Sequence, residues 1–467
     1  MTRLRIAFVG LFAVLAAVLA TPATALAGGG WISDTGTIDG AAYKIEIPAA
    51  WNGTLVLYSH GYVVPGRPNP ARDVGDAGTG AYLLAHGYAL AGSSYSTTGW
   101  ALQQAFHDQI ALLDYFDGKY AVPARTIAWG HSLGGIITGG LIQLNPDRFA
   151  GALPMCGVLA GGPGVWNQGL DAEFVLKTLA SEPDAAGLQL VDITNPGNLA
   201  LAEGVTAAEQ KTPAGRAHLA LAAAVGDGPG WFDPLSPEPA AGDFAAREQN
   251  QFLWDSQVDF PFLFALRAEL EARAGGNPSW NTGVDYTRQL AQSINKDEVM
   301  GLYEAAGLDL QADLEKLENA PRIAADPGAL AYLEKFIVFN GQIAQPVLTM
   351  HTTGDGLVLN QDEEAYASVV RAAGNNSLLR EVFVHRAGHC TFTPAETITA
   401  FNTLIHRLDS GRWEDSTAPD GMNTSAAALG PLNTLGPGTG TVGPSFITFQ
   451  PTKFLRPFDA RDVEDAG

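Results

Sequence analysis

The chain contains the stretch Gly130-His131-Ser132-Leu133-Gly134, which fits the pattern Gly-x-Ser-x-Gly. The apolar residues 126–129 before it predict a buried strand, and the small apolar residues 135–142 after it predict a helix. A serine at a sharp turn between a strand and a helix presents its hydroxyl, and flanking glycines let neighbouring chain pass close by. The stretch therefore predicts a nucleophile elbow with Ser132 at its apex. An ordinary Gly-rich loop is the alternative interpretation of the motif alone.

Other apolar runs on both sides of this stretch alternate with segments of helical character. The runs that predict strands are 54–59, 88–93, 126–129, 151–158, 346–350 and 379–384. Strands that are apolar throughout and alternate with helices are typical of parallel sheets covered on both faces. We therefore expect an α/β protein with a doubly wound, mostly parallel sheet.

The strand pattern stops between residues 161 and 341, where helical segments punctuated by proline and glycine dominate. The expected helices are 172–181, 216–225, 245–273, 284–294, 299–306 and 308–317. We interpret 161–341 as a helical cap inserted into a core made of 28–160 and 342–467. Within the C-terminal extension of that core, the Gly-, Pro-, Thr- and Asn-rich residues 410–443 predict an extended loop.

A serine hydroxyl becomes a good nucleophile only when a base takes its proton and an acid orients that base. Asp355 occupies a sharp turn after the run at 346–350, and His389 follows the run at 379–384. This is the chain order Ser, Asp, His that a strand–turn–helix nucleophile requires. The alternative for Asp355 is a turn aspartate that bonds only its own backbone. The nearby Asp362 and Glu363 fit the acidic first turn of a helix better.

The oxygen of an attacked carbonyl also needs backbone N–H donors that are already in place. We expect one from Leu133, directly after the nucleophile, and one from Tyr62, in a loop after an early strand. His60, Gly61 and His131 are expected to support this geometry. Of the remaining histidines near the site, His351 is expected to pack against it and His385 to be structural.

Together, His60-Gly61-Tyr62, the Ser132 stretch, Asp355 and Gly388-His389 resemble the α/β-hydrolase superfamily. The resemblance covers the core and does not extend to the cap or the tail. It implies a Ser-Asp-His hydrolase that forms an acyl-enzyme and uses no metal or other cofactor, similar to secreted bacterial esterases, lipases or peptidases. Tyr62 is carried over by position only, because no Gly-Gly-Gly run follows His60.

The N-terminus has the features of a secretory signal. Arg3 and Arg5 precede the apolar residues 6–20, and Ala25-Leu26-Ala27 supplies a cleavage site. We expect residues 1–27 to be removed and the protein to be secreted, with a retained anchor as the alternative. The net charge of −22 argues against nucleic acid or anionic lipid as a partner.

The chain has two cysteines, Cys156 and Cys390. Export would place them in an oxidising compartment, where an even number of cysteines favours a disulfide. Cys156 ends the strand after the elbow helix and Cys390 follows His389, so a bridge would hold the histidine loop. Two free buried thiols are the alternative.

Three functions are compatible with these residues. The first is a secreted hydrolase of small-molecule or polymeric carboxylic esters, with an apolar pocket from cap aromatics that could instead simply hold the cap together. These aromatics are Trp166, Trp231, Phe232, Trp254, Phe260, Phe262 and Phe264. The second is a serine peptidase whose cap acids bind a free amino end. The candidate acids are Asp171, Glu173, Asp255, Asp259 and Glu269. The third is a binding protein without activity.

Overall fold

The computed structural model describes residues 31–413 and 416–456. The predicted secretory signal lies outside the described residues. The described chain is built on a 9-stranded sheet with the order β1-β2-β4-β3-β5-β6-β7-β8-β9. Its strands are β1 (Ile32–Ile38), β2 (Ala41–Ile47), β3 (Thr54–Ser59), β4 (Ala89–Ser93), β5 (Arg125–His131), β6 (Gly151–Met155), β7 (Val347–Gly354), β8 (Leu379–Ala387) and β9 (Phe446–Ile447).

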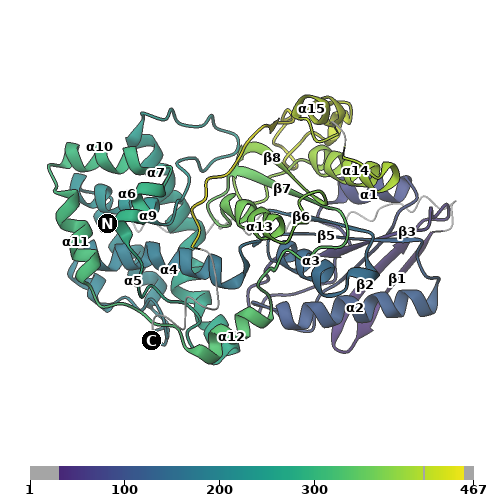
Figure 1. The fold of residues 1–467 in the computed structure, drawn as a ribbon, viewed down its shortest axis with the longest axis horizontal. Coiled ribbons are helices and arrows are strands. Elements are labelled where there is room, and N and C mark those ends of the chain that lie inside the picture. The colour runs from purple at the N-terminus through teal and green to yellow at the C-terminus, as the bar shows by residue number, and fades with distance from the viewer. Residues whose placement is uncertain (1–30, 414–415, 457–467) are drawn as a thin grey trace, which may run out of the picture.

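The middle of the sheet is parallel, from β4 through β3, β5, β6 and β7 to β8, with antiparallel strands at both edges. Helices cover both of its faces (Figure 1). They are α1 (Ala77–Ala85), α2 (Leu102–Lys119), α3 (Leu133–Leu144), α13 (Gln361–Ala372), α14 (Pro394–Ser410) and α15 (Pro419–Ala427). Alternate residues of β3 enter two different cores, Leu55 and Leu57 one and Val56 and Tyr58 the other. This architecture confirms the predicted doubly wound α/β fold.

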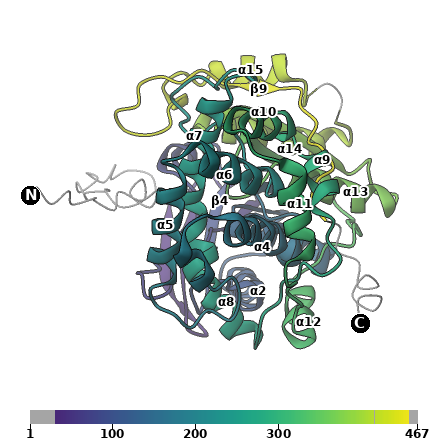
Figure 2. The same ribbon diagram turned by 90° about the vertical axis from the view of Figure 1, so that its left-hand side faces the viewer.

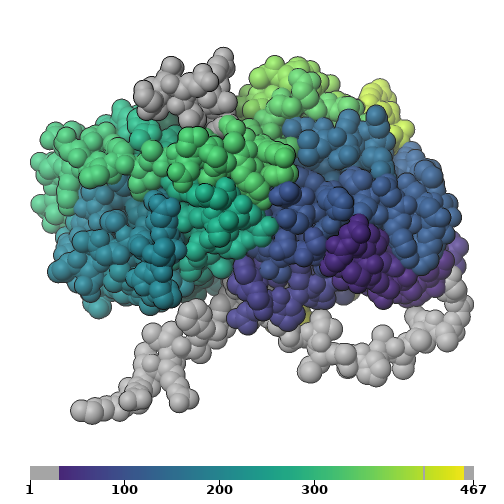
Figure 3. Space-filling view, turned by 90° about the horizontal axis from the view of Figure 1, so that it is seen from below, coloured from purple at the N-terminus to yellow at the C-terminus, as the bar shows by residue number. Residues whose placement is uncertain are grey.

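Between β6 and β7 the chain forms a group of helices beside the sheet (Figures 1 and 2). They are α4 (Gly161–Leu179), α5 (Asn198–Glu209), α6 (Pro213–Val225), α7 (Phe244–Trp254), α8 (Arg267–Ala274), α9 (Tyr286–Gln292), α10 (Lys296–Ala306), α11 (Leu310–Asn319) and α12 (Pro327–Lys335). They enclose an apolar core of their own, which includes Leu170, Phe264 and Tyr286. In Figure 3 this part, coloured teal to green, sits directly against the purple and blue N-terminal part.

The helix expected over 245–273 is present: residues 244–274 are helical throughout, but not all of its turns are α-helical. Two π-helical turns, η4 (Asp255–Asp259) and η5 (Phe262–Leu266), separate α7 from α8. Pro261 lies between these turns and has no N–H to continue an α-helical ladder, so the regular hydrogen bonding breaks there.

The expectation of an extended loop over 410–443 is wrong at α15. Pro419 begins this helix, and Met422 and Ala426 are buried against α14 and β9. Beyond β9 the chain runs from the sheet to the inserted helices (Figure 1). There Arg456 pairs with Asp171 at 2.9 Å. Over the described residues, none of the helices combines the length and the apolar character needed to cross a membrane.

Candidate active site

Ser132 stands at the turn between β5 and α3 with φ 60° and ψ −124°, a conformation that side-chain-bearing residues rarely adopt. The motif glycines make this turn possible. A Cβ on Gly134 would lie 1.9 Å from the carbonyl oxygen of Ser59, and one on Gly130 would lie 2.5 Å from the same atom. Because β3 passes this close, only glycine fits at either position, and the turn has the geometry of the predicted elbow.

The loop after β3 faces the serine. A Cβ on Gly61 would be 3.3 Å from the Cβ of Ser132, and the next residue, Tyr62, lines the same cavity as Ser132 and Leu133. The N–H groups of Leu133 and Tyr62 donate to no other described residue. Two uncommitted donors beside a serine hydroxyl can stabilise negative charge on a carbonyl oxygen bound there.

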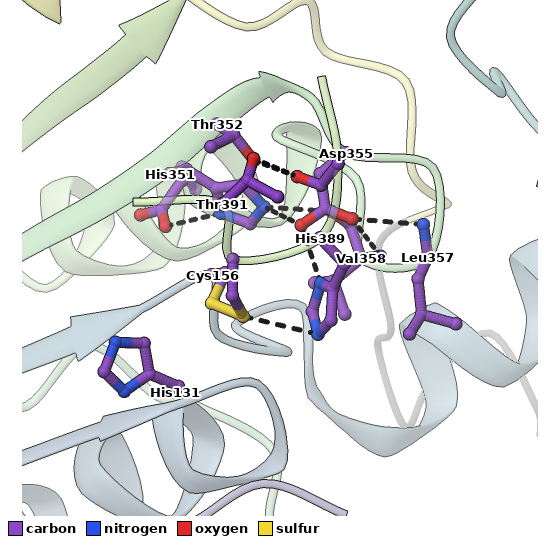
Figure 4. Close-up of a disulfide and its surroundings, with 12 residues drawn as sticks. His131, Cys156, His351, Thr352, Asp355, Leu357, Val358, His389 and Thr391 are labelled. Carbon is purple, nitrogen blue, oxygen red and sulfur yellow. Dashed lines mark hydrogen bonds and ion pairs between the residues drawn. A yellow bond between two sulfur atoms is a disulfide. The ribbon is translucent and has the colours of Figure 1, made fainter. Parts of the chain in front are cut away.

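Asp355 and His389 are in direct contact at the ends of β7 and β8. His389 Nδ1 lies 2.7 Å from Asp355 Oδ2 (Figure 4). The other carboxylate oxygen accepts the backbone N–H groups of Leu357 and Val358, each at 3.1 Å. Burial raises the pKa of Asp355, but the charges and hydrogen bonds of His389 and His351 outweigh it and hold the pKa below its ordinary value. Asp355 is therefore held as a carboxylate.

His351 lies behind Asp355 and is fully buried. Its Nδ1 is 2.9 Å from Glu363, and its Nε2 is 2.9 Å from the carbonyl of Val358 and 3.5 Å from Asp355. A ring whose two nitrogens both face oxygen acceptors donates at both only when it is protonated. Burial lowers the pKa of His351, but Asp355 and Glu363 raise it to about 10 overall. The site thus has a buried imidazolium between two carboxylates.

The sequence analysis expected His351 to pack against the site and Glu363 to lie in the first turn of a helix. In the structure His351 lies in β7, beside the site, and Glu363 lies in the first turn of α13. The contact between the two side chains was missed. It forms because the turn after β7 folds the start of α13 back over the strand. No local sequence pattern reports that contact.

A disulfide joins Cys156, directly after β6, to Cys390, directly after His389. Ser132 N–H donates to the carbonyl of Met155 at 3.0 Å, so the bridge links the chain that supports the serine to the histidine loop. Gly388 N–H also donates to the Gly354 carbonyl at 3.0 Å, which fixes the same loop to the end of β7.

The structure does not join His389 to Ser132. The Ser132 hydroxyl makes no hydrogen bond with any of the described residues, and His389 Nε2 lies 3.4 Å from Cys390 Sγ (Figure 4). Catalytic hydrogen bonds are often long or unformed without substrate. The three predicted residues therefore converge on one sheet edge, with one of their two contacts formed.

Of the supporting histidines, His60 is buried and His131 half-buried, and both are held neutral. His60 contacts the carbonyls of Gly61 and Ser94, and burial lowers its pKa to about 4. His131 makes a hydrogen bond of 3.2 Å with the Tyr58 hydroxyl, and burial, with the charge of His389, lowers its pKa to about 4. Neither histidine contacts the Ser132 hydroxyl, so both act on the shape of the site.

A cavity with an empty volume of about 1010 Å³ opens over Ser132, between the sheet edge and the inserted helices. Of the predicted cap aromatics, Trp166, Phe260 and Phe262 line it, together with Tyr62 and Trp100. The others pack elsewhere: Phe232 lies against Trp254, and Trp254 donates to the Trp231 carbonyl at 2.8 Å. Both interpretations of the cap aromatics therefore apply, each to different residues.

The chain is similar to several known proteins. Residues 85–160 match the model of the prolyl oligopeptidase family. The chain is 30% identical over 427 residues to the o-phthalyl amidase of Xanthobacter agilis, which covers 84% of this chain and 90% of that protein.

Similar solved structures include two esterases of Aspergillus oryzae. One, described as an esterase, has a TM-score of 0.43 and 13% identity, covering 82% of this chain and 80% of that one. The other, feruloyl esterase B, has a TM-score of 0.40 and 12% identity, covering 82% of each chain.

The similarity to the amidase extends over most of both chains, and the sheet is mostly parallel, as the sequence predicted. The chain is a serine hydrolase of the α/β-hydrolase superfamily and belongs to the same family as the o-phthalyl amidase of Xanthobacter agilis.

Proposed function

We propose that this serine hydrolase cleaves amides of small, largely apolar carboxylic acids, with Ser132, His389 and Asp355 as its catalytic triad. The observation that carries the triad is the 2.7 Å contact of His389 with a buried carboxylate, on a loop tied to the strained Ser132 turn. The amide preference rests on the name of the relative, whereas the sequence alone favoured esters.

In this mechanism the Ser132 hydroxyl attacks the carbonyl carbon and gives its proton to His389 Nε2. Asp355 keeps Nδ1–H as the donor and stabilises the imidazolium, while the N–H groups of Leu133 and Tyr62 hold the oxyanion. His389 then protonates the leaving nitrogen, and an acyl group remains on Ser132. Water repeats the sequence and releases the acid. Nε2 has to turn from Cys390 Sγ towards the serine for the first step.

Benzoic 4-nitroanilide and 4-nitrophenyl benzoate, which share one acyl group, test the reaction. We expect both to be hydrolysed, and Ser132→Ala to lower kcat for both by about 10,000-fold or more. Turnover of the ester with none of the anilide would restore the ester hydrolase as the better description. If a fluorophosphonate fails to label Ser132 in the folded protein and neither substrate turns over, the chain is a binding protein.

Two further parts of the proposal concern the N-terminal residues 1–27 and the inserted residues 161–341. Residues 1–27 act as a secretory signal, so N-terminal sequencing of protein from the medium should begin at Gly28. Residues 161–341 act as a cap that selects the substrate, because they supply most of the cavity wall opposite Ser132. Replacing wall residues should change substrate preference more than it changes labelling of Ser132.

A further inference from the structure

Three carboxyl groups lie on the cap side of the cavity, from two elements far apart in sequence. Glu173 belongs to α4, and Asp255 and Asp259 belong to the π-helical turn η4. The rest of the wall is mainly aliphatic and aromatic. The wall of this cavity is therefore an apolar surface that contains three carboxyl-bearing residues.

None of these carboxyl groups has a partner among the described residues. Glu173 is 1% exposed, and neither of its oxygens makes a hydrogen bond. Asp259 Oδ1 is likewise inaccessible and unpaired, and Asp255 forms no hydrogen bond or ion pair with the described chain. The charge of Arg267 acts on Glu173, but Arg267 Nε and Nη2 donate to Glu271 and Asn277, each at 3.0 Å, and its Nη1 makes no hydrogen bond with the described residues. An unpartnered buried polar group is unfavourable, so its retention needs an explanation.

Two other candidate acids of the inserted helices, Asp171 and Glu269, are paired. Asp171, two residues before Glu173 on α4, pairs with Arg456 and accepts the Tyr286 hydroxyl at 3.0 Å. Glu269 accepts from Arg273 and from the N–H of Trp100. The sequence analysis named five acids as candidates for binding an amine. Three of them line the cavity, and Asp171 and Glu269 do not.

The three carboxyl groups do not form a metal site. Their oxygens do not come within 4.8 Å of one another as a set, as binding of one ion would require; among the described residues only Cys156, His389 and Cys390 form such a group, and the cysteines are joined to each other. Separated acceptors on an apolar wall suit an organic cation whose N–H donors point in several directions.

Burial acts on each carboxyl in the same direction. It raises the pKa of Glu173 to about 8, with Arg267 opposing and Glu271 adding to the shift. It raises the pKa of Asp255 to about 7, with the charge of Glu248 adding. Burial raises the pKa of Asp259 well above its ordinary value, with Asp255 and Asp355 adding. A bound cation would reverse this repulsion and desolvation, whereas a bound anion would add to them as soon as one carboxyl ionised.

We propose that this wall is a subsite for a protonated amine on an otherwise apolar substrate. This inference depends on the proposed function in one respect, because it takes the bound amine to be part of a substrate. The ammonium donates to carboxylates of the wall, and the apolar body of the substrate lies against Trp166, Phe260 and Phe262. The subsite would let the enzyme prefer amine-bearing acyl compounds over neutral or acidic ones of equal size.

Calorimetry on the Ser132→Ala protein at pH 7 tests this subsite without any turnover. The probes are 2-phenylethylamine, 2-phenylethanol and 3-phenylpropanoate, which share an aromatic body and differ in charge. We expect the amine to bind at least about tenfold more tightly than the alcohol, and the carboxylate more weakly than either. Equal affinities, or tightest binding of the carboxylate, would overturn the proposal.

Variants then assign the effect to the wall. Glu173→Gln and Asp259→Asn, made separately because they lie on different elements, should each reduce the amine-to-alcohol affinity ratio several-fold. Glu304→Gln, an exposed acid of α10, should leave the ratio unchanged. A ratio that survives both cavity variants would contradict the subsite. Near-ultraviolet circular dichroism identifies a variant that fails to fold, and the other variant then decides.

The failures of the two proposals are distinguishable. Loss of Ser132 labelling with intact amine binding would reject the hydrolase mechanism and keep the subsite. Labelling of Ser132 and turnover without any preference for the amine would keep the hydrolase mechanism and reject the subsite.

Discussion

Buried carboxyl groups on the two sides of the cavity differ in the number of partners that they contact. On the sheet side, Asp355 has contacts with two histidines and two backbone N–H groups. On the cap side, Glu173 is as deeply buried and has no hydrogen-bond partner among the described residues. The first arrangement is complete without a ligand and fixes the position of a base. The second is incomplete until a ligand supplies donors, which suits a surface that selects among substrates.

Asp355→Asn should give the largest effect, because it removes the acceptor that fixes the His389 tautomer. We expect kcat to fall by about 10,000-fold. Initial rates on 4-nitrophenyl benzoate measure it, and the exposed Asp297→Asn is the control. If Asp355→Asn retains most of its activity, Asp355 does not fix the position of the base, and another acid orients His389.

Removal of the disulfide should give the next largest effect, on stability. The bridge closes a segment of 234 residues, so Cys156→Ala with Cys390→Ala should lower the free energy of unfolding by about 3–5 kcal/mol. Urea unfolding measures this change. An unchanged stability would mean that the contacts of Gly354 with Gly388 hold the histidine loop without the bridge.

His351→Gln tests whether the buried imidazolium positions Asp355. Loss of one hydrogen bond to a charged group should lower kcat by about 10- to 100-fold. It should also shift the pH–rate profile of kcat, because Asp355 loses a positive neighbour, and a purely structural role would not move that profile. His86→Gln, at the exposed end of α1, should change neither kcat nor the profile. An unmoved profile with reduced kcat would make His351 a packing residue.

The smallest expected effect is the pH dependence of stability caused by the cap side. An acid with a raised folded pKa binds its proton more tightly in the native state, so its contribution is lost as pH rises above the unfolded pKa. For Glu173 the window runs from 4.5 to about 8, and for Asp255 from 3.8 to about 7. His351 acts in the same direction from 6.5 to about 10.

The free energy of unfolding should therefore fall as pH rises from 6.5 to 8, above the range in which His60 and His131 act in the opposite direction, and Glu173→Gln should flatten part of that slope. Urea unfolding at several pH values measures both. The slope will not vanish in the variant, because burial also raises the pKa of Glu381 to about 8. A stability that rises over this range would contradict the description of the cap carboxyls.

The core of the fold was predictable because its signals are local. The apolar strands and the Ser132 stretch require only neighbouring residues, and parallel strands then bring their carboxyl ends to one edge. For that reason Asp355 and His389 could be paired from chain order before any contact was known. The helix at Pro419–Ala427 was missed because its composition is that of a loop, and its stability comes from packing Met422 and Ala426.

The sequence by itself determined the mostly parallel α/β sheet and the residues proposed to carry the chemistry, since an apolar strand and a Gly-flanked turn are recognisable from adjacent residues. Only the tertiary structure decided how the cap acids divide. Asp171 and Glu173 are two residues apart on one helix, where side chains at that spacing point in different directions. Asp171 pairs with Arg456, 285 residues later, whereas Glu173 lines the cavity and has no hydrogen-bond partner in the part of the chain that the structure describes. A contact at that separation depends on how the whole chain packs, and no local pattern encodes it.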